Sequence, residues 1–242
     1  MSAADALDLR VLPAGGWASV VADAFIERLR ARPRLRVCLP TGDTPSPLYA
    51  ELAARDARAP DGAYAQATVV LLDEWLGLLP GDPARCDVRL RRELLDRLAP
   101  PPRFVEIDVD ASDDALAALA HDMASRGLDL ALLGLGMNGH VGFNEPGSRP
   151  DDPTRVVRLA RSSREAAMAR YGAVQVPTGG ITVGLARLLE AEEAWLLVTG
   201  AHKATVLRRA LRSPEGPDSP ASYLRRHPRL TVFADEAAAG EL

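Results

Sequence analysis

The sequence predicts an α/β protein with a mostly parallel central sheet. Short apolar segments alternate along the chain with longer segments of helical periodicity, which is the pattern of repeated β-α units. The 242 residues are enough for one such domain with a sizeable core. Because no internal repeat, low-complexity tract or linker divides the chain, we expect a single domain over residues 1–242, arranged as a Rossmann-like three-layer sandwich.

The expected strands are short runs rich in aliphatic and β-branched residues, bounded by turn-forming residues. The run at 128–133 is almost wholly apolar and is typical of a buried strand. In chain order the strands are expected at residues 34–39, 68–72, 104–107, 128–133, 154–159, 194–198 and 230–233.

The expected helices have apolar residues three and four positions apart. In the second helix, Thr44 is expected as the N-cap and Pro45 at the first position, and Gly127 is expected to end the fourth. Residues 176–183 contain a proline and two glycines and are expected to be irregular. The helices are expected at residues 17–29, 45–55, 88–98, 113–126, 162–171, 184–189, 202–211 and 221–225.

Composition and charge narrow the function classes. Hydrophobic residues at 47% and charged residues at 26% fit an ordinary globular protein, and the net charge of −4 argues against nucleic acid or an anionic membrane as the main partner. The first ten residues lack the apolar core of a signal peptide, and no apolar run approaches the roughly 20 residues that span a bilayer. Two cysteines indicate no disulfide framework. We therefore expect a cytoplasmic protein, and the sequence leaves a homo-oligomer open. The arginines of the helix at 88–98 are expected to form a solvated basic face.

The most informative stretch is the loop that follows the expected strand at 128–133. Several glycines lie between residues 134 and 142, with His140 among them and Glu145 just beyond. Glycine lets a ligand approach the backbone closely, and loops after strand ends are where open α/β sheets bind ligands. His140 can move protons near neutral pH, and Glu145 is close enough in sequence to orient it. The alternative is a surface histidine on an ordinary loop, and the glycine spacing does not fit a dinucleotide-binding fingerprint.

Three further features are candidates for a functional site. The loop at 40–45 joins a strand to the start of a helix, where free backbone N–H groups can bind a phosphate. The alternative is a plain connection without a ligand. A carboxylate of Asp43 that points inward would oppose the binding of an anion. Asp73 and Glu74 follow a buried strand and are candidates for acid–base chemistry, or else for a helix cap or a solvated loop. Lys203 is the one lysine among 29 basic residues and lies in the first turn of a helix, where a cation costs about 0.3–1 kcal/mol unless an anion binds there.

Four blocks of the sequence occur in a fixed order. They are Leu-Pro-Thr-Gly-Asp-Thr-Pro at 39–45, Leu-Asp-Glu-Trp-Leu-Gly-Leu at 72–78, the Gly-His loop, and the segment 176–204. Together they resemble the glucosamine-6-phosphate deaminase/6-phosphogluconolactonase family over about residues 20–238. The continuation Gly-His-Val-Gly-Phe-Asn-Glu-Pro at 139–146 is similar to the deaminase form, because lactonases share Gly-His but usually lack Phe-Asn-Glu-Pro.

The resemblance implies conversion of glucosamine 6-phosphate and water to fructose 6-phosphate and ammonia, with no metal and no cofactor. It implies that Asp73 is the base that moves a proton between C2 and C1. It also implies that His140, oriented by Asn138 and Glu145, is the proton shuttle for ring opening. The implied partner is a small-molecule sugar phosphate, held by Gly42, Asp43, Thr44, Arg170 and Lys203, with Arg164 as the alternative to Arg170.

The sequence departs from the family pattern at three positions. Asn138 stands where many deaminases have Asp, Asp43 where a second Gly is usual, and Trp75 where a Tyr is usual. Two other functions stay open, and the departures at Asn138 and Asp43 bear on the second. One is hydrolysis of a sugar-phosphate lactone, with His140 activating water, and the other is a non-catalytic sugar-phosphate sensor.

Overall fold

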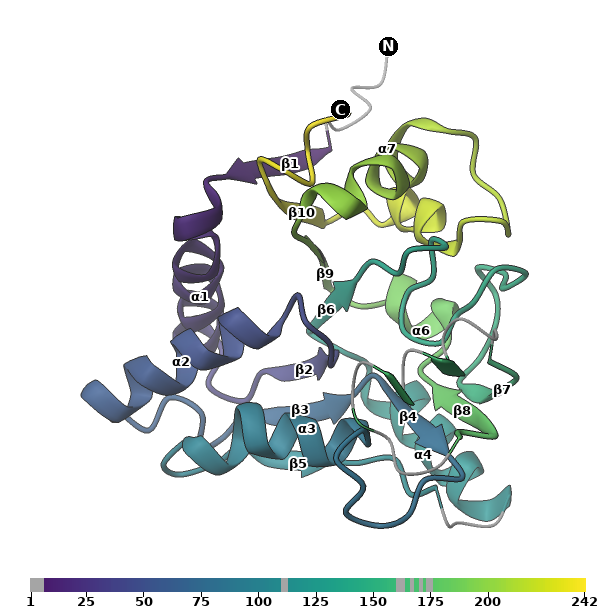
Figure 1. Cartoon of the computed structure of the whole chain (residues 1–242). Coiled ribbons are helices and arrows are strands. Elements are labelled where there is room, and N and C mark those ends of the chain that lie inside the picture. The colour runs from purple at the N-terminus through teal and green to yellow at the C-terminus, as the bar shows by residue number, and fades with distance from the viewer. Residues whose placement is uncertain (1–6, 110–112, 160–163, 166–167, 170–171, 173–175) are drawn as a thin grey trace.

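The computed structural model describes residues 7–109, 113–159, 164–165, 168–169, 172 and 176–242. A seven-stranded sheet forms its centre, in the strand order β1-β10-β9-β6-β2-β3-β5, with every neighbouring pair parallel (Figure 1). The predicted α/β fold with a mostly parallel central sheet is confirmed. The strands of this sheet are β1 (Asp8–Leu12), β2 (Arg36–Leu39), β3 (Thr68–Leu71), β5 (Arg103–Val105), β6 (Leu130–Gly134), β9 (Glu193–Val198) and β10 (Leu230–Asp235).

A smaller antiparallel sheet lies beside the central one and contains β4 (Asp73–Leu76), β8 (Gly179–Thr182) and β7 (Arg155–Val157). The expectation of an irregular segment at 176–183 is therefore wrong for its second half. The glycines of β8 allow close packing. A Cβ at Gly180 would lie 2.4 Å from the Phe143 ring, and a Cβ at Gly179 would lie 2.9 Å from the Val157 carbonyl oxygen.

Helices surround the central sheet (Figure 1). The predicted Thr44 N-cap is wrong, because the helix after this loop begins at Ser46 without a side-chain cap; the Ser46 hydroxyl instead donates to the Gly42 carbonyl at 2.8 Å. The expected helix at 162–171 lies mostly outside the described residues. None of the helices in the described part of the chain has the length and apolar character needed to cross a membrane. The helices are α1 (Ala14–Ala31), α2 (Ser46–Arg58), α3 (Cys86–Glu93), α4 (Asp113–Arg126), α6 (Leu185–Leu189) and α7 (Ala204–Arg212), with 3-10 turns η1 (Leu95–Arg97), η2 (Ala201–Lys203) and η3 (Pro220–Arg226).

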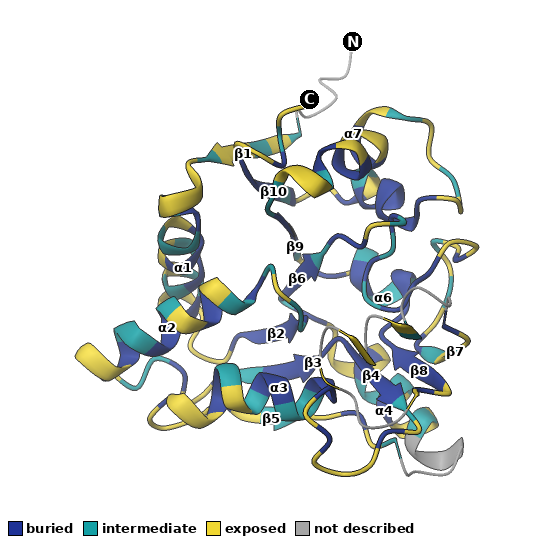
Figure 2. Cartoon of the chain, in the orientation of Figure 1, coloured by how far each residue is buried: buried dark blue, intermediate teal, exposed yellow. Residues whose placement is uncertain are grey.

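The core lies along the inner strands of the central sheet, which are buried along almost their whole length (Figure 2). Trp195 of β9 packs on Phe233 of β10 with a ring-centroid distance of 5.1 Å. Helix α1 contributes Trp17, whose indole N–H donates to the Phe233 carbonyl at 3.1 Å. This packing fixes the strands, so the loops at their carboxyl ends start from rigid positions.

The strand order reverses direction between β2 and β6. From β2 the chain proceeds outward through β3 and β5, and it then returns to β6 and continues through β9 and β10 on the other side. In open α/β sheets, ligands bind outside the carboxyl ends of the strands at such a reversal. The segments that leave β2, β3, β6 and β9 at this edge are residues 40–45, 72–73, 135–143 and 199–203.

Candidate active site

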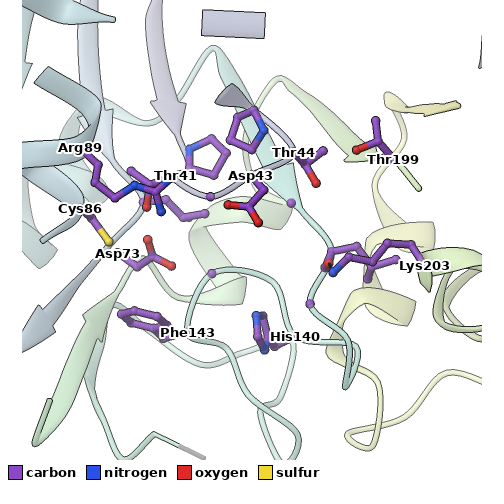
Figure 3. A pocket seen from close by; sticks show the side chains of 18 of the residues that line it. Thr41, Asp43, Thr44, Asp73, Cys86, Arg89, His140, Phe143, Thr199 and Lys203 are labelled. Atoms are coloured by element: carbon purple, nitrogen blue, oxygen red, sulfur yellow. Dashed lines mark hydrogen bonds between the residues drawn. The ribbon is translucent and has the colours of Figure 1, made fainter. Parts of the chain in front are cut away.

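A cavity of about 220 Å³ opens where these four segments meet (Figure 3). Each segment contributes side chains or backbone to its wall, although the segments are widely separated in the sequence. The cavity therefore brings together most of the residues that the sequence suggests for a site. Those that line it are Gly42, Asp43, Thr44, Asp73, His140 and Lys203.

Asp73 lies where the chain passes from the central sheet into the smaller one. It is the first residue of β4, pairs with Thr182 of β8, and is only 7% exposed. Burial raises the pKa of Asp73 to about 7, while His140 and the Cys86 thiol act in the opposite direction. A carboxyl group with a pKa near neutrality can accept and return a proton at physiological pH.

His140 reaches the cavity from the loop after β6. Its ring packs directly over Gly136, because a Cβ at that position would lie 2.2 Å from His140 Nε2. The Gly136 backbone N–H also donates to the His140 carbonyl at 2.9 Å. Glycine at 136 is therefore a packing requirement of the histidine ring.

Asn138 and Glu145 form a hydrogen-bonded set around His140. Asn138 Nδ2 donates to Glu145 Oε2 at 2.7 Å, and Asn138 Oδ1 accepts the His140 backbone N–H at 3.1 Å. Glu145 Oε2 lies 3.5 Å from His140 Nδ1, which has no hydrogen bond within the described residues. An amide at 138 can donate to an ionised Glu145, whereas a carboxylate there would repel it. Asn in place of the more usual Asp at position 138 is thus compatible with an ionised Glu145 held next to His140.

Glu74 has a different environment from its neighbour Asp73. It is fully buried, and its Oε1 accepts the backbone N–H groups of Trp75 at 2.8 Å and Cys86 at 2.9 Å. Its Oε2 accepts the backbone N–H of Asp87 at 2.8 Å. Glu74 therefore caps the start of α3, as one of the alternatives from the sequence predicts.

Lys203, the expected phosphate ligand, lies at the opposite end of the cavity from Phe143 (Figure 3). Lys203 ends η2 directly before α7, and its Nζ donates to the Leu135 carbonyl at 2.5 Å. The Asp43 carboxylate points into the cavity (Figure 3), so it opposes an anion beside the 40–45 loop. Arg170 lies outside the described residues, and Arg164 is not among the residues that line the cavity. Within the described residues, no group of three or more His, Cys, Asp or Glu side chains has an arrangement that could hold a metal ion.

Helix α3 contributes two cavity residues that the sequence does not predict. Arg89 lines the cavity, is only 7% exposed and donates through Nη2 to Glu93 at 3.1 Å, so the predicted solvated face is wrong at this position. Cys86, one turn earlier, is a free buried thiol that lies beside the Asp73 carboxyl (Figure 3) and acts to lower the pKa of that carboxyl. Cys86 and Arg89 are three residues apart, so both side chains lie on the same face of α3. This spacing was the feature of the sequence that could have linked the two residues to one site.

The comparisons with known proteins agree with this geometry. Residues 14–232 match the family described as glucosamine-6-phosphate isomerases/6-phosphogluconolactonase. The chain belongs to this family. Its residues 39–45, 72–78 and 139–146, which carry the resemblance, fall on the segments that leave β2, β3 and β6 and line or support the cavity.

Individual relatives within the family cover nearly the whole chain. A glucosamine-6-phosphate deaminase from Rhodopirellula baltica is 38% identical over 100% of this chain and 98% of its own length. One from Pseudarthrobacter chlorophenolicus is 40% identical over 92% of this chain and 87% of its own length. The solved structure of a monomeric glucosamine-6-phosphate deaminase superposes with a TM-score of 0.90 at 28% identity, covering 98% of this chain and 100% of that chain. A 6-phosphogluconolactonase from Trypanosoma brucei superposes with a TM-score of 0.80 at 18% identity, covering 98% and 99%, and shares the fold.

Proposed function

We propose that this protein is a glucosamine-6-phosphate deaminase, which converts glucosamine 6-phosphate and water to fructose 6-phosphate and ammonia. The observation that carries the proposal is the buried Asp73, with a pKa of about 7, in the same cavity as His140. The relatives that match at 38% and 40% identity are deaminases and support it. The cavity wall draws on segments from residue 40 to residue 203, so we also propose that the whole chain acts as one domain.

The first chemical step is opening of the sugar ring. A proton must leave the anomeric hydroxyl and a proton must reach the ring oxygen, which yields a free aldehyde at C1. His140 can carry this proton near neutral pH. The Asn138 amide holds Glu145 next to the imidazole ring of His140. There the Glu145 carboxylate orients the imidazole and stabilises the imidazolium during the transfer.

The second step is an isomerisation between C2 and C1. The Asp73 carboxylate takes the proton from C2, and the electron pair of that bond forms the C1=C2 double bond. The π pair of the C1 carbonyl moves to O1, which takes up a proton from water to give the enolamine. The protonated carboxyl then gives a proton to C1, leaving a C2 imine that water hydrolyses to the ketone and ammonia. A single carboxyl with a pKa near 7 is available at neutral pH both as the ionised base and as the protonated acid, so it can perform both transfers.

The phosphate of the substrate anchors it at the opposite end of the cavity. Lys203 and the Gly42–Thr44 backbone supply donors there, and Arg170 is the further cation that the family resemblance suggests. Binding energy from this remote group positions C1 and C2 beside the carboxyl of Asp73. The inward Asp43 carboxylate weakens phosphate binding at this end, so replacement of Asp43 by Gly should lower KM.

Release of ammonia tests the proposal directly. Purified protein is incubated with glucosamine 6-phosphate, beside the variant Asp73→Asn. Ammonia from the wild type and almost none from the variant supports both the activity and the role of Asp73. No ammonia from the wild type would refute the activity on this substrate.

A lactonase is the second candidate, since His140 could instead activate water for attack on a lactone. Glu145 discriminates between the two, because ring opening of an amino sugar needs the oriented histidine whereas lactone hydrolysis has no evident need for Glu145. Glu145→Gln should therefore impair ammonia release and spare hydrolysis of 6-phosphogluconolactone. Hydrolysis of the lactone without ammonia release by the wild type, unchanged in Glu145→Gln, would favour the lactonase.

A further inference from the structure

The turn that carries His140 is held from outside by the C-terminal part of the chain. Within the turn, the Gly139 N–H donates to the Gly136 carbonyl at 2.9 Å. The carbonyl groups of Leu135, Asn138 and Gly139 accept hydrogen bonds from the segments after β9. The donors are Lys203 Nζ to Leu135 O at 2.5 Å, Arg209 Nη2 to Asn138 O at 2.6 Å and Ala221 N to Gly139 O at 2.9 Å.

Arg209 is the donor to the carbonyl of Asn138, the residue directly before Gly139. Its side chain extends from α7 and is in close contact with Gly139, because a Cβ there would lie 3.0 Å from Arg209 Nη2. Gly139 has a φ of +90°, which a side chain rarely allows, so the turn itself has an unusual backbone conformation. A charge-assisted hydrogen bond to the neighbouring carbonyl therefore stabilises the turn in the conformation that His140 requires.

Asn138, whose carbonyl accepts the hydrogen bond from Arg209, is also the residue that orients His140. The Asn138 side chain donates to Glu145 and accepts the His140 backbone N–H. A shift of the Asn138 backbone would therefore move both partners of the histidine ring together.

We propose that Arg209 is a positioning residue for the reaction, acting through Asn138 on His140 and Glu145. The effect on turnover rests on the proposed deaminase function, whereas the effect on the turn does not. Loss of the guanidinium should leave substrate binding intact and misplace the histidine, because a displacement of about 1 Å can cost about 100-fold in rate.

Helix α7 provides a matched control at the adjacent position. Arg208 is also exposed, but its Nε pairs with Glu241 at 3.2 Å and makes no hydrogen bond to the turn among the described residues. Replacing either arginine with Met removes one charge from the same helix and keeps a long side chain. A difference between Arg209→Met and Arg208→Met therefore reports the contact with the turn and not the loss of a surface charge.

The experiment combines kinetics with amide hydrogen exchange on the full chain. Arg209→Met should lower kcat for ammonia release by about 10-fold or more, with KM changed by less than about 2-fold, and should speed exchange of the Gly139 and His140 amides. Arg209→Lys, which keeps a cationic donor, should recover part of both losses, and Arg208→Met should match the wild type. Wild-type kcat and exchange in Arg209→Met, or an equal loss in Arg208→Met, would overturn the proposal. If the wild type releases no ammonia, the deaminase function fails, and faster exchange only in Arg209→Met still decides the role of Arg209 in the turn.

Discussion

Replacement of the buried Asp73 by Asn should stabilise the protein while it abolishes activity. Burial raises the pKa of Asp73 from 3.8 to about 7, so the ionised carboxylate is less favourable in the folded chain than in the unfolded one. The penalty begins above the unfolded pKa, grows as the pH rises, and is complete above the folded pKa. About three pKa units at 1.36 kcal/mol each give about 4 kcal/mol, and Asn avoids this cost.

Urea denaturation at two pH values measures this effect. The free energy of unfolding of Asp73→Asn should exceed that of the wild type by about 4 kcal/mol at pH 8.5 and by less than about 2 kcal/mol at pH 5. Asp61→Asn is a suitable control, because Asp61 is exposed and the neighbouring Arg30 lowers its pKa, so its replacement should stabilise at neither pH. An equal gain for Asp73→Asn at both pH values would refute ionisation of Asp73 as the source.

Three further variants test the contacts around the same carboxyl and histidine. Gly136→Ala should lower turnover by about 100-fold with unchanged circular dichroism, because the new Cβ would lie 2.2 Å from His140 Nε2, and wild-type turnover would contradict this packing. Cys86→Ala should move the acid limb of the activity–pH profile to higher pH, because the Cys86 thiol lowers the pKa of Asp73. Cys86→Ser should return the acid limb to its wild-type position, and identical profiles for all three proteins would exclude an effect of residue 86 on Asp73. Glu74→Gln should lower the free energy of unfolding in urea by about 1–3 kcal/mol, because an amide cannot accept backbone N–H groups at both ends, and an unchanged midpoint would argue against the helix cap.

The inner strands of the central sheet could be predicted because their burial requires apolar side chains. The same argument explains the strands that the pattern does not predict. β1 lies at an edge, and its residues are exposed or only partly buried, so it lacks an apolar run. β8 contains adjacent glycines, which resemble a loop in sequence but are required by the close approach of Phe143 and Val157.

The candidate site could be predicted in part, because Asp73, His140 and Lys203 lie in the segments that follow strands whose carboxyl ends share one edge. Arg89 and Cys86 could not be assigned, since their place in the wall depends on how α3 packs against β4. The family resemblance assigns the base to Asp73, whereas the role of Glu74 as a helix cap needed the fold. A sequence with two adjacent acids does not indicate which of them meets the start of a helix.

The smaller sheet determines which of these two acids faces the cavity. Consecutive side chains of a strand point to opposite faces, so Asp73 and Glu74 cannot both reach the substrate. Asp73 pairs with Thr182 and Glu74 with Ile181 in the antiparallel ladder of β4 and β8. A slip of one residue in that ladder would bury Asp73 against α3 and turn Glu74 toward the cavity, with no change in composition. The identity of the proton-exchanging carboxyl is thus encoded in strand register, so a single-residue insertion or deletion in β8 should be more damaging to catalysis than most substitutions of the same strand.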